Sequence, residues 1–157
     1  MWDDITELKE HLTEYLDSAH EFQNNTFVSH PEYYIKYFRM RQQQCETLQN
    51  MHSQLRKIRT MPEEAHIVSD FISEMAEHVT EMNDPQALIK KLQATVDHIG
   101  EGKLPTTRDE FENKALLYHM LMDLEEFLLF KKRFIESIDE VQFQIYWKEE
   151  IEGKIEQ

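Results

Sequence analysis

The sequence predicts an all-α fold, an up-and-down antiparallel bundle of four long helices and one shorter helix. Three observations support this prediction. Glycine and proline, which interrupt helices, occur only three and four times in 157 residues. Helix-starting patterns recur along the chain with few residues between them. Apolar residues follow each start at the three- and four-residue spacing of an amphipathic helix.

Five helices are expected, at roughly 4–24, 31–59, 62–82, 85–99 and 107–137. Each begins near two residues that have strict or approximate capping-box spacing. These pairs are Asp4 with Glu7, Ser29 with Glu32, Thr60 with Glu63, Asn83 with Gln86, and Thr107 with Glu110. Three of the prolines lie just inside such starts, where a missing N–H costs nothing. Because the connections are short, consecutive helices should run antiparallel.

Apolar stripes justify the first four helices in order. The first stripe is Ile5, Leu8, Leu12, Tyr15, Leu16, Ala19 and Phe22. The second is Tyr34, Tyr37, Phe38, Cys45, Leu48, Met51, Leu55 and Ile58. The third is Ile67, Val68, Phe71, Met75 and Val79, and the fourth is Leu88, Leu92, Val96 and Ile99. Each stripe would face the interior of the bundle.

The fifth helix is apolar on more than one face. From Ala115 to Phe130, 12 of 16 residues are apolar. A helix covered on one side only would show a single stripe, so we expect this one to be surrounded, inside a bundle or at a subunit contact. Thr107 is placed to cap its first turn, and Glu110 can reach back to the N–H of the cap.

The expected domain organisation is one helical-bundle domain over residues 1–137, followed by a C-terminal tail over 138–157. In the tail Val141, Phe143, Ile145 and Trp147 alternate as a strand would. At helical spacing, another set roughly fits a helix instead: Ile138, Val141, Ile145, Ile151 and Ile155. Because one strand would have no sheet to join, we favour a short helix or a segment ordered by contact.

Composition excludes several classes of function. The net charge of −14 repels phosphates, so nucleic acid is not an expected partner. The single cysteine, Cys45, allows no internal disulfide and no cysteine-based zinc site, and we interpret it as a small core residue. No run of about 18 uncharged apolar residues is present, as a membrane span would need, and the first residues do not resemble a signal peptide.

Catalytic and metal-binding patterns are weak. A di-iron bundle needs two Glu-x-x-His motifs, and the chain has one, Glu63 to His66. Glu74 and His78 are four residues apart, a pairing common by chance. No nucleotide-binding or nucleophile motif is present. We therefore expect a protein that is not an enzyme, with no metal site and no cofactor.

Two charged residues interrupt apolar stripes, namely Arg41 in the second helix and Glu125 in the fifth. The favoured interpretation is structural: both lie in or beside the core, facing each other as a charge pair. The alternative is a binding site, in which Arg41 holds a carboxylate and tyrosines such as Tyr34 stack nearby. The second helix also gathers basic residues, including Lys36 and Arg39, which we interpret as ordinary surface pairing rather than as a contact with an acidic helix.

Two segments carry a family resemblance. They are Tyr33 to Arg41, YYIKYFRMR, and Leu104 to Ala115, which contains TRDEFENKA; Asp123 to Leu128, DLEEFL, and Lys131 follow. With these motifs, residues 31–135 resemble the C-terminal domain of the putative aromatic acid exporter family of Gram-positive bacteria. The resemblance implies a helical domain on the cytoplasmic face of the plasma membrane, with membrane helices that precede Trp2 and are absent from this chain.

The resemblance also directs the functional expectation. We expect a regulatory or assembly domain that contacts its own transmembrane region and forms a homo-oligomer through the fifth helix or the tail. A small aromatic carboxylate is a further candidate partner, although the charge of −14 would repel it at long range. The alternatives are a free-standing helical interaction module and, less favoured, a metal-binding helical bundle.

Overall fold

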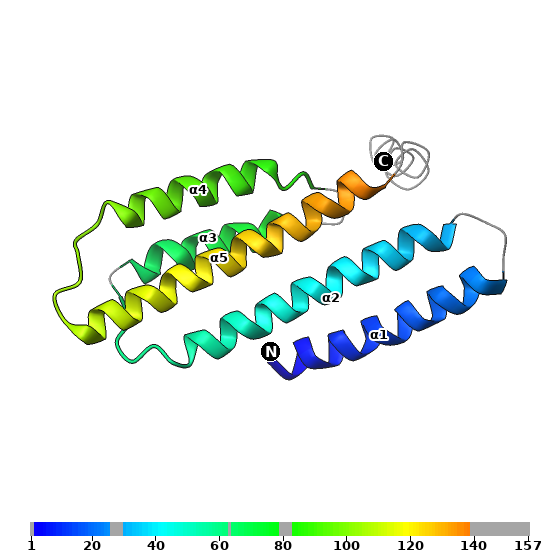
Figure 1. Cartoon of the computed structure of the whole chain (residues 1–157), viewed down its shortest axis with the longest axis horizontal. Coiled ribbons are helices and arrows are strands. Elements are labelled where there is room, and N and C mark those ends of the chain that lie inside the picture. Colours follow the sequence, from blue (N-terminus) through cyan, green and yellow to red (C-terminus); the bar gives the residue numbers. More distant parts are fainter. Residues whose placement is uncertain (1, 26–29, 63, 79–82, 139–157) are drawn as a thin grey trace. The chain divides into compact units, whose positions relative to one another are not determined.

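The computed structural model describes residues 2–25, 30–62, 64–78 and 83–138, and these residues form five α-helices and no strand (Figure 1). The helices are α1 (Trp2–Asn25), α2 (His30–Leu55), α3 (Ala65–His78), α4 (Gln86–Gly100) and α5 (Arg108–Ser137). The predicted all-α class is confirmed. The tail after Ile138, for which a short helix was favoured, lies outside the described residues.

The helix boundaries differ from the predicted ones mainly around residue 60. The second helix ends at Leu55 rather than at residue 59. The Arg56 N–H still donates four residues back, but those of Lys57 and Ile58 donate three residues back, to Gln54 and Leu55. Such tighter turns are common at helix ends. The third helix begins at Ala65, whose N–H donates to the carbonyl of Pro62. Because α3 spans 14 described residues and α4 spans 15, the described helices are three long and two short.

Two predicted helix starts can be compared with the structure in detail. At α5 the Glu110 N–H donates to Thr107 Oγ1 at 3.2 Å, and the Thr107 N–H donates to Glu110 Oε2 at 3.3 Å. The predicted capping box is therefore confirmed. At α4 the carboxylate that accepts from the Gln86 N–H, at 2.9 Å, belongs to Asp84. The predicted cap at Asn83 is therefore wrong: the side-chain acceptor lies one residue later, at Asp84, and the N-cap lies two residues later, at Pro85, which offers no side-chain acceptor.

The chain divides into two compact units: the first combines Met1–Cys45 with Phe130–Gln157, and the second is Glu46–Leu129. The helices α2 and α5 each contribute to both units. Within the first unit α1 and the start of α2 run in opposite directions, as α3 and α4 do within the second (Figure 1). The prediction of one domain over residues 1–137 stays a prediction.

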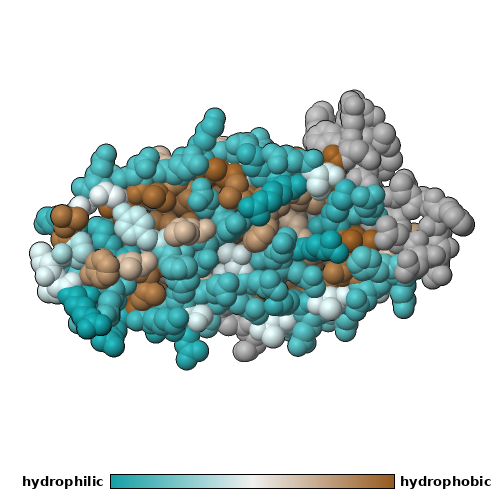
Figure 2. Space-filling view, viewed as in Figure 1, coloured by the Kyte–Doolittle hydropathy of each residue, from teal (hydrophilic) through white to brown (hydrophobic). Residues whose placement is uncertain are grey.

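The Glu46–Leu129 unit contains an aliphatic core with two phenylalanines. Its buried residues come from α2, α3, α4 and α5, and the largest share comes from α5: Leu117, Met120, Leu121, Leu124, Phe127 and Leu128. On the face drawn in Figure 2, hydrophilic side chains cover most of the surface and hydrophobic ones show in patches between them. The buried α5 residues line one face of this helix. Its opposite face is exposed at Phe111, Ala115, His119, Met122 and Glu126, so the helix is not surrounded within this unit as the sequence predicted.

The other unit has an aromatic core. Tyr33 is almost fully buried, and its ring lies 5.5 Å from that of Phe134 and 6.3 Å from that of Tyr37, between centroids. Tyr37 also contacts Phe134, at 5.8 Å. Aromatic pairs at such separations stabilise beyond the area that they bury. Cys45 is buried here, as predicted for a small core residue.

Candidate functional site

Arg41, the first predicted site residue, is half-buried on α2 and is bound by neutral groups. Its Nε donates to the Tyr37 hydroxyl at 3.1 Å, and its Nη1 donates to Gln44 Oε1 at 3.0 Å. The guanidinium carbon also lies 5.1 Å from the centre of the Tyr37 ring, within cation–π distance. Because both hydrogen-bond partners are uncharged, these contacts position the guanidinium without neutralising it.

Tyr34, the second predicted site residue, lies farther out. It is 43% exposed, and its ring contacts those of Tyr33, at 5.4 Å, and Phe38, at 6.2 Å. The tyrosine that stacks with Arg41 is instead Tyr37. The four-residue spacing of Tyr37 and Arg41 on a helix is the signal that could have identified this pair.

Glu125, the third predicted site residue, belongs to the Glu46–Leu129 unit, whereas Arg41 belongs to the other unit. Glu125 lines a cavity of about 150 Å³ between α4 and α5, together with Asp97, Tyr118 and Leu121. Two carboxylates on an otherwise largely apolar wall would repel an anionic ligand. The Arg41–Glu125 charge pair stays a prediction.

A basic cleft of about 180 Å³ lies between α2 and α5 in the first unit, lined by Lys36, Arg39 and Arg133. Lys36 Nζ donates to the Ser137 carbonyl at 2.8 Å and lies 2.9 Å from Glu32 Oε1. The Arg133 guanidinium lies over the Phe130 ring at 5.4 Å. Because Arg133 is far from the two α2 residues in sequence, no local spacing could have predicted this cleft. Ligand pockets usually measure 300–1,000 Å³, so this one suits a single acidic group.

A cavity of about 480 Å³ lies where Thr60, Met61, Pro62 and Glu64 meet the 103–107 segment and the start of α5. Two of its charged side chains, Lys114 and Glu64, are paired with each other. Lys114 Nζ lies 3.0 Å from Glu64 Oε1 and donates to the Lys103 carbonyl at 3.0 Å. The hydrogen bond from Lys114 lowers the pKa of Glu64 below its ordinary value.

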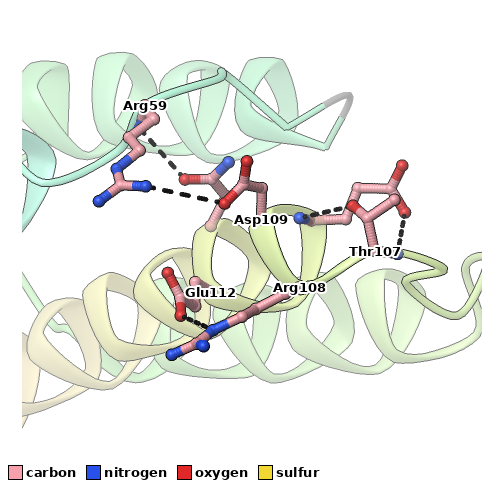
Figure 3. A network of polar contacts seen from close by, with 7 residues as sticks. Arg59, Thr107, Arg108, Asp109 and Glu112 are labelled. Atoms are coloured by element: carbon pink, nitrogen blue, oxygen red, sulfur yellow. Dashed lines mark hydrogen bonds and ion pairs between the residues drawn. The ribbon is translucent and has the colours of Figure 1, made fainter.

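Figure 3 shows the contacts beside this cavity. The Asn113 side chain, which is buried, accepts from the Arg59 N–H at 3.2 Å, and the Arg59 guanidinium lies 3.8 Å from Asp109. On the outer face Arg108 donates to Glu112 at 2.8 Å. These contacts attach the segment after α2 to the first turns of α5. We interpret the region as a structural joint rather than as a binding pocket.

The two metal-binding patterns find no support among the residues that can be described. The Glu74 carboxylate contacts Lys91, and His78 Nδ1 lies 2.8 Å from the Glu74 carbonyl oxygen. Glu63 of the Glu63–His66 pair lies outside the described residues. Among the residues with described positions, no three His, Cys, Asp or Glu side chains are grouped to hold a metal ion.

The membrane-spanning capacity of the helices can be judged from their length and hydropathy. Among residues 2–25, 30–62, 64–78 and 83–138, no helix is both long and apolar enough to cross a bilayer. This agrees with the sequence, which has no long uncharged apolar run.

Comparisons with known proteins identify relatives of the chain. It is 27% identical over 131 residues to the uncharacterized protein YqjA of Bacillus subtilis, and the match covers 83% of this chain but 41% of YqjA. The chain thus spans less than half of that relative. It is also similar to a solved structure of a putative membrane protein from Clostridium difficile, with a TM-score of 0.74 and 26% identity, covering 85% of this chain and 79% of the other.

The family model that matches the chain is described as the putative aromatic acid exporter C-terminal domain, and the match runs over residues 2–132. This range extends the resemblance seen in the sequence, which began at residue 31, to include α1. The chain therefore belongs to the family of putative aromatic acid exporter C-terminal domains.

Proposed function

We propose that the chain is a regulatory or assembly domain of an aromatic acid exporter-like membrane protein, placed at the cytoplasmic face and not itself catalytic. The observation that carries the proposal is the family match over residues 2–132, combined with the 41% of YqjA that the chain spans. A relative of that length has room for a membrane region beyond the part that this chain matches.

Of the two roles, the geometry favours assembly. Two of the cavities described above, of about 150 and 180 Å³, are smaller than ordinary ligand pockets. The third has its main charges, Lys114 and Glu64, paired with each other. Large apolar side chains, in contrast, are exposed on several helices, including Tyr15, Met122 and Phe111. Such side chains supply contact surface for another protein.

Binding of an aromatic carboxylate is the second candidate role, and the observation in its favour is the Arg41–Tyr37 pair with its uncharged partners. Titration of the chain with benzoate by calorimetry tests it. An assembly domain should show no saturable binding. Saturable binding that is lost in Arg41→Gln and kept in Arg39→Gln would instead support a ligand-sensing role.

Two observations test the proposed membrane context. One is the sequence of the complete reading frame that contains this chain, and the other is whether the encoded protein is found in the membrane or the soluble fraction of the cell. We expect several apolar stretches of about 20 residues outside residues 1–157, and a product that sediments with membranes. A frame confined to these residues, with a product in the soluble fraction, would favour a free-standing helical interaction module. Stoichiometric iron, manganese or zinc in protein purified without added metal would favour a metal-binding bundle.

A further inference from the structure

The basic cleft between α2 and α5 is built from two rows of residues with the same helical spacing. The row on α2 is Lys36, Arg39, Met40 and Gln43, and the row on α5 is Phe130, Arg133, Phe134 and Ser137. In both rows the later residues follow the first by three, four and seven positions. Because such spacing places residues on one side of a helix, each helix turns one continuous face to the cleft.

The floor of the basic cleft is apolar and its rim is cationic. Met40 and Phe134 are buried, at 3% and 4% exposure, whereas Arg39 and Arg133 are exposed and Lys36 is half-buried. None of the described residues that line the cleft carries a carboxylate. An apolar floor excludes water from one side, so the cations attract an anion more strongly here than on an open surface.

Lys36 is held in position by two contacts at the end of α5 and the start of α2. Its Nζ donates to the Ser137 carbonyl at 2.8 Å and lies 2.9 Å from Glu32 Oε1. Glu32 therefore offsets the charge of Lys36. An ammonium group has three N–H donors, so Lys36 keeps one for a ligand.

The two arginines supply the excess positive charge. Within the part of the chain that the structure describes, the Arg39 side chain has no ion pair. The Arg133 guanidinium lies 5.4 Å from the centre of the Phe130 ring, a contact that orients it without adding negative charge. Glu136, the acid that follows Arg133 on α5, lies 3.9 Å from Lys132. The cleft is thus a local cationic site on a chain of net charge −14.

A phosphate group fits this arrangement better than a carboxylate does. The terminal oxygens of a phosphate point in different directions from one centre, so cations on two helices can each bind a different oxygen. A carboxylate has two oxygens in one plane, which suit the fork of a single guanidinium. Arginine is also the residue most often used to bind phosphate in a defined geometry. At about 180 Å³ the cleft has room for this group, while the rest of the ligand stays outside.

We propose that the basic cleft binds a phosphate group, carried by a soluble phosphoester or by a lipid headgroup, through Lys36, Arg39 and Arg133. The inference goes beyond the proposed function and does not depend on it. The net charge of −14 opposes approach to an anionic bilayer, so the soluble source is the expected one. Because the cationic residues come from both α2 and α5, a bound phosphate connects the two helices and stabilises the first unit.

The first test is titration of the isotope-labelled chain with inorganic phosphate at neutral pH and constant ionic strength, followed by NMR. The expected result is a saturable shift of amide resonances from residues 36–43 and 130–137, with a dissociation constant of about 1–10 mM. Arg39→Gln and Arg133→Gln should each weaken binding about tenfold or more, since each removes a charged hydrogen-bond donor.

The matched control is Arg108→Gln. It makes the same charge change at an exposed arginine of α5 in the second unit, where Arg108 pairs with Glu112 at 2.8 Å. This variant should bind phosphate as the wild type does. Circular dichroism melting of every variant confirms that it folds.

The second test identifies the source of the phosphate. The chain is sedimented with vesicles of phosphatidylcholine alone and of phosphatidylcholine mixed with phosphatidic acid. A chain that binds inorganic phosphate but stays in the supernatant with both vesicles takes a soluble phosphoester. A chain that sediments with phosphatidic acid vesicles only, and less so as Arg39→Gln, takes a lipid headgroup. Both results support the site.

Three outcomes would overturn the inference. The first is the absence of a saturable shift up to about 50 mM phosphate. The second is a shift that the double variant Arg39→Gln/Arg133→Gln retains, which would move the binding out of the basic cleft. The third is acetate binding as tight as phosphate binding, which would reject phosphate as the preferred ligand. Because these titrations use the chain alone, their failure leaves the assembly role untouched.

Discussion

Thr107 is the residue whose local role is clearest, because its hydroxyl accepts the Glu110 N–H at the first turn of α5. Replacing it with alanine leaves that N–H without its side-chain acceptor. We expect Thr107→Ala to lower the free energy of unfolding by about 1 kcal/mol, measured by urea denaturation. Thr107→Ser keeps the hydroxyl and should stay close to the wild type. Equal losses in the two variants would contradict the cap.

Two glutamates should make stability depend on pH on the acidic side. Hydrogen bonds from the backbone and side chain of Thr106 lower the pKa of Glu110, and the hydrogen bond from Lys114 lowers the pKa of Glu64. A carboxyl whose pKa is lower in the folded state contributes stability that is present above its unfolded pKa and is lost as the pH falls through the folded value. The loss should therefore begin below the ordinary value of 4.5.

The measurement is the free energy of unfolding between pH 7 and pH 3 for wild type, Glu64→Gln and Glu110→Gln. In each variant the free energy of unfolding should fall less between pH 7 and pH 3 than in the wild type, because one group whose pKa changes on folding has been removed. Glu101→Gln, at an exposed loop position, is the control and should keep the wild-type profile. A Glu64→Gln profile parallel to that of the wild type would show that the ion pair with Lys114 does not contribute.

At the candidate site, the sequence identified Arg41 because a charge interrupts an apolar stripe, and the structure places it on Tyr37 and Gln44 of the same helix. It pointed to Tyr34 as the stacking residue, but four-residue helical spacing makes Tyr37 the neighbour. Arg133 in the basic cleft could not be predicted at all, since its proximity to Lys36 depends on how α2 and α5 meet. Local spacing thus reveals partners within one helix and not partners between helices.

At the scale of elements, α5 is the helix on which the Glu46–Leu129 core depends. Leu121 is 1% exposed and belongs to that core. Leu121→Ala should lower the free energy of unfolding by roughly 2–5 kcal/mol, since it leaves a cavity that the surrounding helices fill only in part. Met122→Ala, at the exposed neighbouring position, should cost much less. A Leu121→Ala loss below about 0.5 kcal/mol would show that α5 is not central to this core.

The helices could be predicted from the sequence because capping residues and apolar spacing act locally. Their ends were less predictable: α2 stops at Leu55, where the hydrogen bonds shorten to three-residue steps, although apolar spacing continues to Ile58. Exposure was also missed on α1. Its stripe predicted burial for Leu8, Tyr15 and Phe22, yet each is about half exposed. A stripe shows that a face can be buried, and the packing partner decides how much of it is.

At the scale of the whole molecule, the surface is acidic but its charges are not evenly spread. On α1, Glu7 and Glu14 lie 3.8 and 3.5 Å from His11, whereas Lys36, Arg39 and Arg133 gather in one cleft. A chain of net charge −14 repels other copies of itself unless such neutral or basic regions provide a place to meet. Association should therefore strengthen with added salt, which screens the remaining repulsion. Sedimentation at about 50 mM and 500 mM sodium chloride checks this, and weaker association at high salt would indicate a contact held by charge pairs.

The proposed function rests on the family more than on any single pocket. The match over residues 2–132 shows the family, and the 41% span of YqjA is the ground on which a domain working beside another region is proposed. Composition and periodicity predicted the fold class, and the family resemblance predicted the context. Neither could identify the contact surface, because that depends on which apolar side chains the fold leaves uncovered.

The measurement that tests the central claim most directly is the number of subunits per complex. It is compared, after solubilisation in detergent, between the full gene product and a version that lacks residues 1–157. Light scattering coupled to size-exclusion chromatography gives the protein mass of each complex. The account predicts an oligomer when this domain is present and a smaller copy number, with the product still extracted from membranes, when it is deleted. The same copy number in both would contradict an assembly role for the domain.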